Sequence, residues 1–203
     1  MNAILSSGIG ALPPWVVPAI LIGVSVLMLT VIFERGYILF RLNQNMSPVE
    51  VREIVKLVKQ GKYDDAKQFS DGKGHPGYRA LKYVLENRNS GIDLHSVIEE
   101  AMVREQTQLE RFTSFLGTTS TLAPMLGLLG TVTGMIKAFS AFARAAQRSS
   151  QLVVGIDEAL ITTTLGLIIA IPALIFFNLY VKRTSLLMDE CQLLMTQVER
   201  ELR

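Results

Sequence analysis

The feature that most constrains this chain is a long apolar run, which follows the adjacent acids Asp157 and Glu158 and meets no further charge until Lys182. Roughly 20 residues of this kind are enough to cross the hydrocarbon core of a bilayer as a helix. An ionisable side chain at the mouth of such a helix is costly to keep there, so Glu158 is the first candidate for a functional residue. The working hypothesis is that Glu158 handles protons or cations.

Two other segments have the same apolar character. The first begins at Trp15, an aromatic of the type that lies at membrane interfaces, and the second carries no charge before Lys137. We therefore predict three transmembrane helices, at residues 15–38, 113–140 and 156–181.

The segment between the first two spans, residues 39–112, has the composition of a soluble, helical region. Ser47 and Glu50 form a capping box with a proline between them at the first helical position, and apolar residues then recur at helical spacing up to Gly61. Shorter helices are expected over 63–69 and 78–86. Because no alternating strand pattern occurs, the predicted fold class is an all-α integral membrane protein.

Two of the three membrane helices are expected to be very long and to extend into the helical cytoplasmic domain. Asp93 can cap a helix that no proline or glycine interrupts before Gly117, so we expect it to continue directly into the second span. The third span is likewise expected to continue as a helix through the tail, residues 182–203.

The basic residues predict the orientation in the membrane. Thirteen of the 20 Lys and Arg residues lie between Glu34 and Phe112 and four in the tail, whereas the leader 1–14 and the loop 141–155 together hold two. By the positive-inside rule, the large domain and the tail are cytoplasmic, and the leader and the loop are periplasmic.

Several function classes are not supported by the composition. A formal charge of +2 is too small to indicate nucleic acid binding, and the single cysteine, Cys191, leaves no intrachain disulfide. No Cys/His cluster has metal-ligand spacing, and His75 and His95 lie in polar segments where we expect them to be exposed. No serine has a plausible histidine partner and no nucleotide fingerprint is present, so we expect neither an enzyme nor a cofactor.

Small and hydroxyl residues are dense on the second and third spans. Thr162 lies one helical turn from Glu158 on the same face, Thr163 lies about 140° around the helix, and Thr131 lies roughly 9 Å inside the end of its span. Hydroxyls at such positions can bond across helices or line a wet path, and small residues let helices approach closely. We assign to helix packing Gly127, Gly130, Gly134, Gly166 and Pro172.

A purely structural role stays open for several of these residues. Asp157 and Glu158 can stabilise a helix N-terminus, where the helix dipole favours acids, and we prefer this interpretation for Asp157. Glu158 can also reach water or pair with Lys137 across the outer interface. Each threonine hydroxyl can bond to a carbonyl of its own helix.

Two motifs, followed by AIPA at 170–173 and by Asn178, resemble a known family: LGLLGTVTGM at 126–135 and GIDEALITTTLG at 155–166. Together with the outward N-terminus, the large cytoplasmic insertion and the two long helices, they resemble the ExbB/TolQ/MotA proton-channel family. Because MotA-like members have four spans and this chain has three, the resemblance is closest to the ExbB/TolQ branch.

The resemblance implies a bacterial inner-membrane motor subunit that assembles as a homopentamer around a dimer of single-span ExbD/TolR-like partners. Proton flow would be coupled to work on a TonB- or TolA-like protein. The resemblance assigns the pore glutamate to Glu158 and the pore threonines to Thr131 and Thr163, and it puts the titrating aspartate on the partner. Glu158 would then be a polar gate or relay, and this chain alone should conduct poorly.

The sequence leaves the pathway open between ExbB-like transport across the outer membrane, TolQ-like envelope maintenance and gliding-type motility. A competing hypothesis is a structural membrane scaffold without ion conduction, in which the Gly- and Thr-rich spans serve oligomerisation. A small-solute transporter is disfavoured because no inverted repeat or broken helix is visible.

Overall fold

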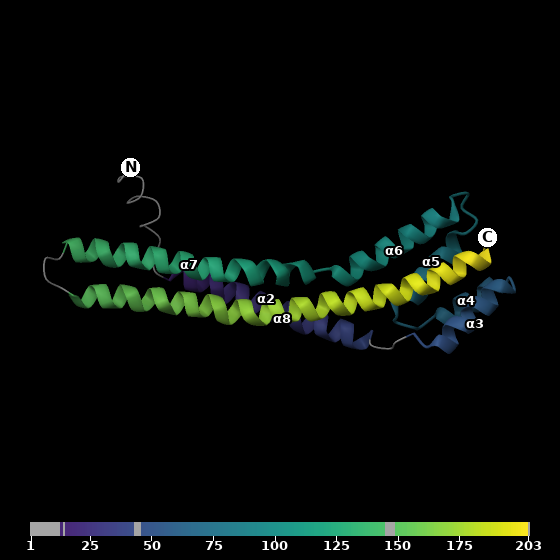
Figure 1. The fold of residues 1–203 in the computed structure, drawn as a ribbon, viewed down its shortest axis with the longest axis horizontal. Coiled ribbons are helices and arrows are strands. Elements are labelled where there is room, and N and C mark those ends of the chain that lie inside the picture. The colour runs from purple at the N-terminus through teal and green to yellow at the C-terminus, as the bar shows by residue number, and fades with distance from the viewer. Residues whose placement is uncertain (1–12, 14, 43–45, 145–148, 203) are drawn as a thin grey trace. The chain divides into compact units, whose positions relative to one another are not determined.

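The computed structural model describes Pro13 and residues 15–42, 46–144 and 149–202 (Figure 1). Its helices are α2 (Val16–Arg41), α3 (Pro48–Lys59), α4 (Tyr63–Ser70), α5 (Pro76–Asn87), α6 (Leu94–Glu110), α7 (Thr113–Arg144) and α8 (Ser149–Leu202). No strand occurs among the described residues, which confirms the all-α prediction. The predicted leader, apart from Pro13, and residues 145–148 of the predicted loop lie outside the described residues.

Within the described part of the chain, three helices are long and apolar enough to cross a membrane. They are Val16–Phe40, Thr113–Ser140 and Gly155–Leu202. The three-span prediction is therefore confirmed. At 1.5 Å per residue, the 54 residues of α8 extend over roughly 80 Å, well beyond a hydrocarbon core of about 30 Å. The third span thus continues as helix through the tail, as the sequence indicated.

The prediction that the helix after Asp93 runs unbroken into the second span is wrong. Helix α6 ends at Glu110 and α7 begins at Thr113, because Phe112 adopts a left-handed conformation with φ 62°. That conformation is rare for a residue other than glycine and cannot continue a right-handed helix. The guanidinium groups of Arg35 and Arg111 lie 5.5 and 4.8 Å from the centre of the Phe112 ring and hold it by cation–π attraction.

Capping residues and glycines close in sequence determine where α3 and α5 begin and where α3 ends. The capping box at the start of α3 is present, with Ser47 and Glu50 each accepting a backbone N–H, and Gly61 follows the helix end at φ 72°. Helix α5 begins two residues before the predicted Tyr78, because the His75 ring caps the helix and Pro76 occupies its first position.

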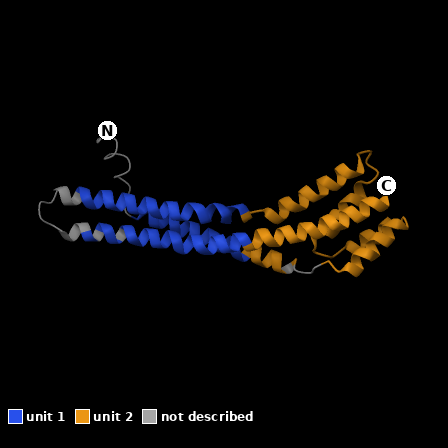
Figure 2. Cartoon of the chain, viewed as in Figure 1, with its two compact units in different colours: residues 1–33, 114–178 blue, residues 34–113, 179–203 orange. Residues whose placement is uncertain are grey.

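The chain divides into two compact units (Figure 2). Unit 1 consists of Met1–Phe33 and Ser114–Asn178, and unit 2 consists of Glu34–Thr113 and Leu179–Arg203. Unit 1 therefore holds most of the apolar length of the spans. Unit 2 holds α3 to α6 together with the C-terminal ends of α2 and α8.

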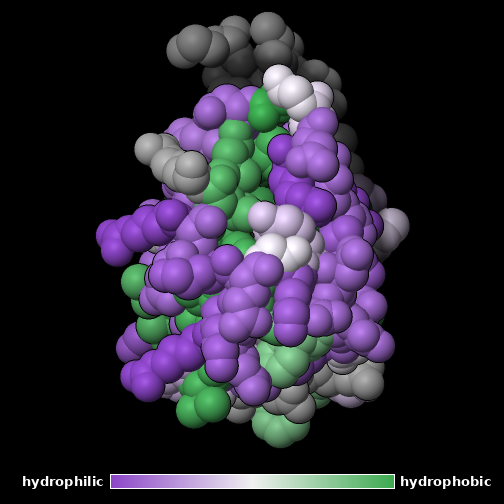
Figure 3. Space-filling view, turned by 90° about the vertical axis from the view of Figure 1, so that its right-hand side faces the viewer, coloured by the Kyte–Doolittle hydropathy of each residue, from purple (hydrophilic) through white to green (hydrophobic). Residues whose placement is uncertain are grey.

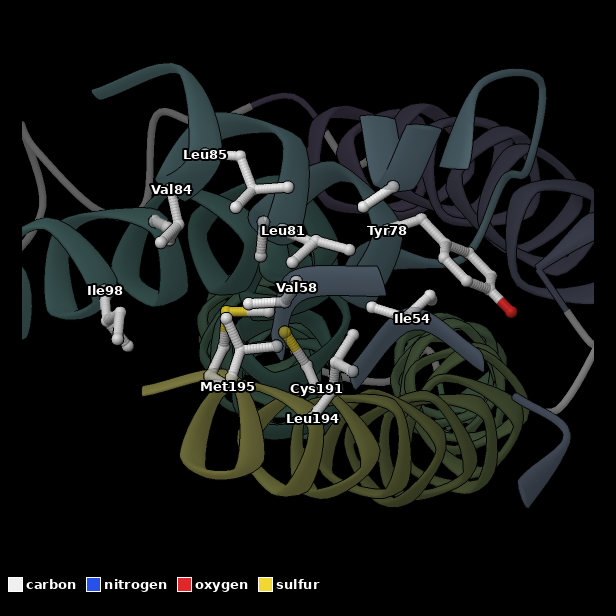
Figure 4. Packing of buried hydrophobic residues seen from close by; sticks show 14 of the residues in the cluster. Ile54, Val58, Tyr78, Leu81, Val84, Leu85, Ile98, Cys191, Leu194 and Met195 are labelled. Carbon is white, nitrogen blue, oxygen red and sulfur yellow. The ribbon is translucent and has the colours of Figure 1, made fainter. Parts of the chain in front are cut away.

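A hydrophobic core organises unit 2 (Figure 4). It is built from apolar residues at helical spacing on α3, α5, α6 and the end of α8, among them Ile54, Val58, Leu81, Val84, Leu85, Ile98, Leu194 and Met195. Burying each of these side chains stabilises the fold by about 1.5–3 kcal/mol. The face of unit 2 turned toward the viewer in Figure 3 is mostly hydrophilic, which fits a domain that stands in water.

Candidate functional site

The candidate site lies in unit 1, where α7 and α8 run antiparallel and in close contact (Figure 1). A Cβ atom placed on Gly127 would lie 3.0 Å from the Cα atom of Thr163, and one placed on Gly166 would lie 2.6 Å from the carbonyl oxygen of Ala123. These distances leave no room for a side chain at either glycine. The two backbones therefore approach as closely as small residues allow.

The same close contact continues toward the other end of the helix pair. A Cβ atom on Gly130 would lie 2.6 Å from the Cβ atom of Thr162, and one on Gly134 would lie 3.1 Å from the Cβ atom of Ala159. The contact residues of α7 are three or four positions apart, and those of α8 recur at the same interval, with the adjacent Thr162 and Thr163 sharing one turn, so one stripe on each helix forms the contact. The four glycines assigned to packing from the sequence thus join α7 to α8 within one chain.

The threonine hydroxyls differ in what they bond. Thr163 Oγ1 donates to the carbonyl oxygen of Gly127 across the helix pair, at 3.2 Å. Thr162 is buried and its hydroxyl donates within α8, to Ala159, while Thr131 donates within α7, to Leu128. A hydroxyl that donates one hydrogen bond still has lone pairs that can accept a hydrogen bond from another group, such as water. Thr131 is half-buried, so its oxygen remains close to the surface of the pair.

Glu158 lies in α8 one helical turn before Thr162, and its side chain lies outside the described residues. Ala159 packs against Gly134, which places the backbone of Glu158 level with the neighbouring turn of α7. From that level, Thr131 is about one turn, or roughly 6 Å, further along the pair. The structure therefore brings the backbone of Glu158 and the three threonines into about two turns of one helix pair.

The remaining predicted packing residue, Pro172, lies inside α8, which continues through it without a break. Proline has no N–H, so the carbonyl of Ile168 receives no helical hydrogen bond from residue 172. The next residue, Ala173, is fully buried.

Sequence reasoning did not single out the alanines of the contact. Ala123 and Ala159 face glycines across the helix pair, and both are buried. It also passed over Thr133 as a site residue, although this side chain is buried and donates to the Leu129 carbonyl at 2.9 Å. The signal that could have found the alanines is their spacing of four or seven residues from the glycines, which extends the same stripe.

The prediction that His75 is exposed is wrong, since only 2% of the residue is accessible. Its Nε2 lies 3.0 Å from Glu190 Oε2, and its Nδ1 accepts the Gly77 N–H at 3.1 Å. The same Glu190 oxygen accepts the Met46 N–H at 3.3 Å. The carboxylate thus joins the start of α5, the segment before α3 and the end of α8, all within unit 2.

The contacts of His75 require a neutral ring. Because Nδ1 accepts a backbone N–H, the single ring proton belongs on Nε2, where it is donated to Glu190. Burial lowers the pKa of His75, against the opposing pull of the Glu190 charge. His95 is exposed, as predicted. Among the described residues, no three His, Cys, Asp or Glu side chains gather where they could hold a metal ion.

A second polar cluster ties α3 to α5. Glu50 accepts bonds from Lys73 Nζ at 2.6 Å and from the Tyr78 hydroxyl at 2.8 Å, in addition to its capping bond. The bond from Lys73 and then that from Tyr78 lower the pKa of Glu50, while burial, followed by the bond to Glu50, raises the pKa of Tyr78. These groups hold the shorter helices of unit 2 together.

Comparison with known proteins matches residues 75–192 to the MotA/TolQ/ExbB proton channel family. The biopolymer transport protein ExbB-like 3 of Synechocystis is 30% identical over 196 residues, which cover 92% of this chain and 89% of that protein. The Tol-Pal system protein TolQ of Pseudomonas aeruginosa is 30% identical over 181 residues, 82% of this chain and 78% of TolQ. The biopolymer transport protein ExbB of Xanthomonas campestris is 39% identical over 89 residues, 43% of this chain and 35% of that protein.

Proposed function

Because the chain belongs to the MotA/TolQ/ExbB proton channel family, we propose that it is the channel subunit of an inner-membrane motor that couples the proton motive force to TonB-dependent, ExbB-like transport across the outer membrane. The family is one of channels and not of enzymes. The observation that carries the proposal is the close pairing of α7 and α8, which gathers Glu158, Thr131, Thr162 and Thr163 within about two helical turns.

Each of these residues has a proposed role. Glu158 acts as a polar gate or relay at the mouth of the path, because an ionisable group there attracts and passes on cations. Thr131 offers a hydroxyl oxygen at the surface of the helix pair. Thr163 is held by its bond to Gly127, and Thr162 fills the space beside Gly130. The titrating aspartate belongs to a single-span ExbD/TolR-like partner.

The assembly we propose is a homopentamer around a dimer of that partner, which passes work to a TonB- or TolA-like protein. Support comes from the faces of α7 that remain uncovered. The stripe of glycines is used within the chain, whereas Met125, Leu128 and Val132 on the same helix are exposed. Apolar side chains of this kind must meet either lipid or another chain. Copies would therefore contact one another through faces other than the glycine stripe.

The orientation we propose has the N-terminus in the periplasm and unit 2 in the cytoplasm. It is supported by the hydrophilic face of unit 2 (Figure 3) and by the concentration of Lys and Arg residues between Glu34 and Phe112.

A second candidate is the TolQ-like role in envelope integrity and cell division. It is favoured by the similarity to TolQ of Pseudomonas aeruginosa, whose identity of 30% equals that of the ExbB-like relative. Deleting the gene in its host separates the two candidates. Loss of siderophore uptake with a normal envelope supports the ExbB-like role, and sensitivity to detergents with normal uptake supports the TolQ-like role.

Proton flux in liposomes tests the channel itself. The chain is reconstituted alone or together with a co-expressed single-span protein that carries an aspartate in its span, and acidification is followed with an enclosed pH-sensitive dye. We expect flux with the partner and little flux from the chain alone. A chain that assembles with the partner and still conducts no protons would contradict the proposal and favour a structural scaffold.

A further inference from the structure

A cleft of about 740 Å³ opens in unit 2 beside the C-terminal end of α2. One wall is formed by the last turns of α2, and the others by the loop between α4 and α5 and by the end of α6. Two arginines near helix ends line the cleft: Arg35 lies in the last two turns of α2, and Arg111 directly follows α6. Unlike the α7–α8 contact, this cleft has no place in the proposed proton path.

Arg35 is an unusual residue for such a position, because it is charged and yet only 4% exposed. Its donors are poorly matched: one terminal nitrogen reaches the Gln108 carbonyl at 3.4 Å, and another lies 3.8 Å from Glu34 Oε1. Its Nε atom is buried with no hydrogen-bond partner among the described residues. A guanidinium has five N–H donors, and burying them unsatisfied is costly. The Nε donor is therefore left without an oxygen partner, and the side chain can take a further oxygen ligand.

The charge of the cleft indicates what that ligand is. Arg79 also lines it but is neutralised by Glu105, whose Oε2 lies 2.6 and 2.8 Å from two of its nitrogens. Arg35 and Arg111 then face a single carboxylate, that of Glu34, at the lining. One positive charge is left over. Two guanidinium groups with one excess charge suit an oxyanion of charge near minus one, as in a phosphodiester.

The apolar part of the lining indicates the rest of the molecule. Ile38 and Leu42 line the cleft, and Ile38 belongs to the apolar helix Val16–Phe40, which is long enough to span a membrane. Tyr37, beside it, is exposed and of the type found at membrane interfaces. A ligand with an anionic head and an apolar tail can satisfy both the arginines and this wall. Phospholipids have that chemistry and are present where a span leaves the bilayer.

We propose that this cleft binds the phosphate of an anionic phospholipid, with the guanidinium groups of Arg35 and Arg111 as its hydrogen-bond donors. The lipid would occupy donors that the chain itself leaves unused, and it would bridge the end of α2 to the break between α6 and α7. That break carries Phe112, which both arginines already contact. The headgroup thus becomes part of the packing between these two segments.

The test uses the full chain purified in detergent and native mass spectrometry to count bound lipid. Phosphatidylglycerol, phosphatidylcholine and inorganic phosphate are titrated separately, and phosphate is also added as a competitor. The variants are Arg111→Gln, which alters an exposed side chain, and Arg35→Gln. The matched control is Arg52→Gln, which removes the same charge from an exposed position on α3 outside this cleft. Circular dichroism checks that each variant keeps its helices.

We expect saturable binding of phosphatidylglycerol that both Arg35→Gln and Arg111→Gln weaken by about tenfold or more, as loss of a charge-assisted bond should. The Arg52→Gln control should bind as the unaltered chain does. If inorganic phosphate binds and competes with the same dependence on both arginines, the phosphate site stands and soluble phosphate is its ligand. Equal phosphatidylglycerol binding by the unaltered chain and by a folded Arg111→Gln variant would overturn the proposal.

Discussion

The hydroxyl of Thr163 on α8 donates a hydrogen bond to the carbonyl oxygen of Gly127 on α7, at 3.2 Å. This contact is possible because Gly127 has no side chain, so the Thr163 backbone lies directly against it. A residue proposed for the proton path is thereby fixed by a residue proposed for packing. The small residues and the hydroxyls of the motifs thus both contribute to the contact between α7 and α8.

Substitution of Thr163 tests that bond. Thr163→Val keeps the branched shape and removes the donor, and we expect it to destabilise the α7–α8 pair by about 0.6 kcal/mol, the average for such bonds between membrane helices. Thr163→Ser keeps the hydroxyl and should retain most of the bond. Unfolding in detergent with added denaturant measures the difference. A valine variant as stable as the serine variant would show that the bond contributes nothing.

Enlarging a glycine of the contact should be much more harmful. At Gly166 an added Cβ would lie 2.6 Å from a backbone oxygen that cannot move aside, so Gly166→Ala should cost about 1–3 kcal/mol through overpacking. The matched control is Gly23→Ala on α2, where nothing lies within 4 Å of the added atom. Thermal unfolding in detergent compares them. If both variants melt at the same temperature, the α7–α8 contact is not as close as described.

His75 makes the stability of unit 2 depend on pH. Its folded-state pKa is lowered below the ordinary value of about 6.5, so the unfolded chain takes up a proton more readily than the folded one. The stabilising contribution is thus complete above pH 6.5 and is lost as pH falls below it, with a slope of at most about 1.4 kcal/mol per pH unit. The charged groups around the ring that bear on this titration are Glu190, Arg183 and Arg79.

The control for this prediction is His75→Asn, since asparagine can cap α5 as the histidine does but does not titrate. Denaturant unfolding at a series of pH values should give a flatter profile for the variant just below pH 6.5. Glu50, whose pKa is also lowered, adds a separate loss of stability near and below about pH 4.3 in both proteins. Identical profiles for the two proteins would contradict the role assigned to His75.

The core of unit 2 gives a simpler prediction. Leu81 is fully buried among α3, α5, α6 and α8, so Leu81→Ala should lower the free energy of unfolding by about 2–5 kcal/mol. Val103 lies on the exposed side of α6, and Val103→Ala should change the stability by less than about 0.5 kcal/mol. Chemical denaturation of the full chain measures both. A loss at Val103 as large as that at Leu81 would mean that another chain covers this face of α6.

Much of this fold could be predicted from the sequence because its signals are local. The apolar runs have the length of a bilayer, and the Ser47–Glu50 box and Gly61 mark the bounds of α3 by their own chemistry. What escaped prediction depends on distant residues. Phe112 breaks the helix without being glycine or proline, and the arginine that holds it from α2 is far away in the chain. His75 can be buried because Glu190, 115 residues later, accepts the hydrogen bond from its Nε2–H.

The candidate site, too, could be predicted from the sequence only in part. The density of Gly and Thr predicted close packing and a polar path, and the glycines do lie at a helix contact. The sequence could not say which helix would be the partner, because a stripe of small residues can face the same chain or another one. Its assignment to the α7–α8 pair follows only from the distances at Gly127, Gly130, Gly134 and Gly166.

The role of Glu158 is tested most directly by proton flux through liposomes that contain this chain and the proposed single-span partner, compared between Glu158→Gln and Asp157→Asn. Both variants remove one carboxylate charge from adjacent residues of α8, and Asp157 is exposed. If Glu158 is the gate or relay, Glu158→Gln lowers proton flux by about tenfold or more while the complex still assembles, and Asp157→Asn conducts normally. Normal flux through a fully assembled Glu158→Gln complex would contradict that role.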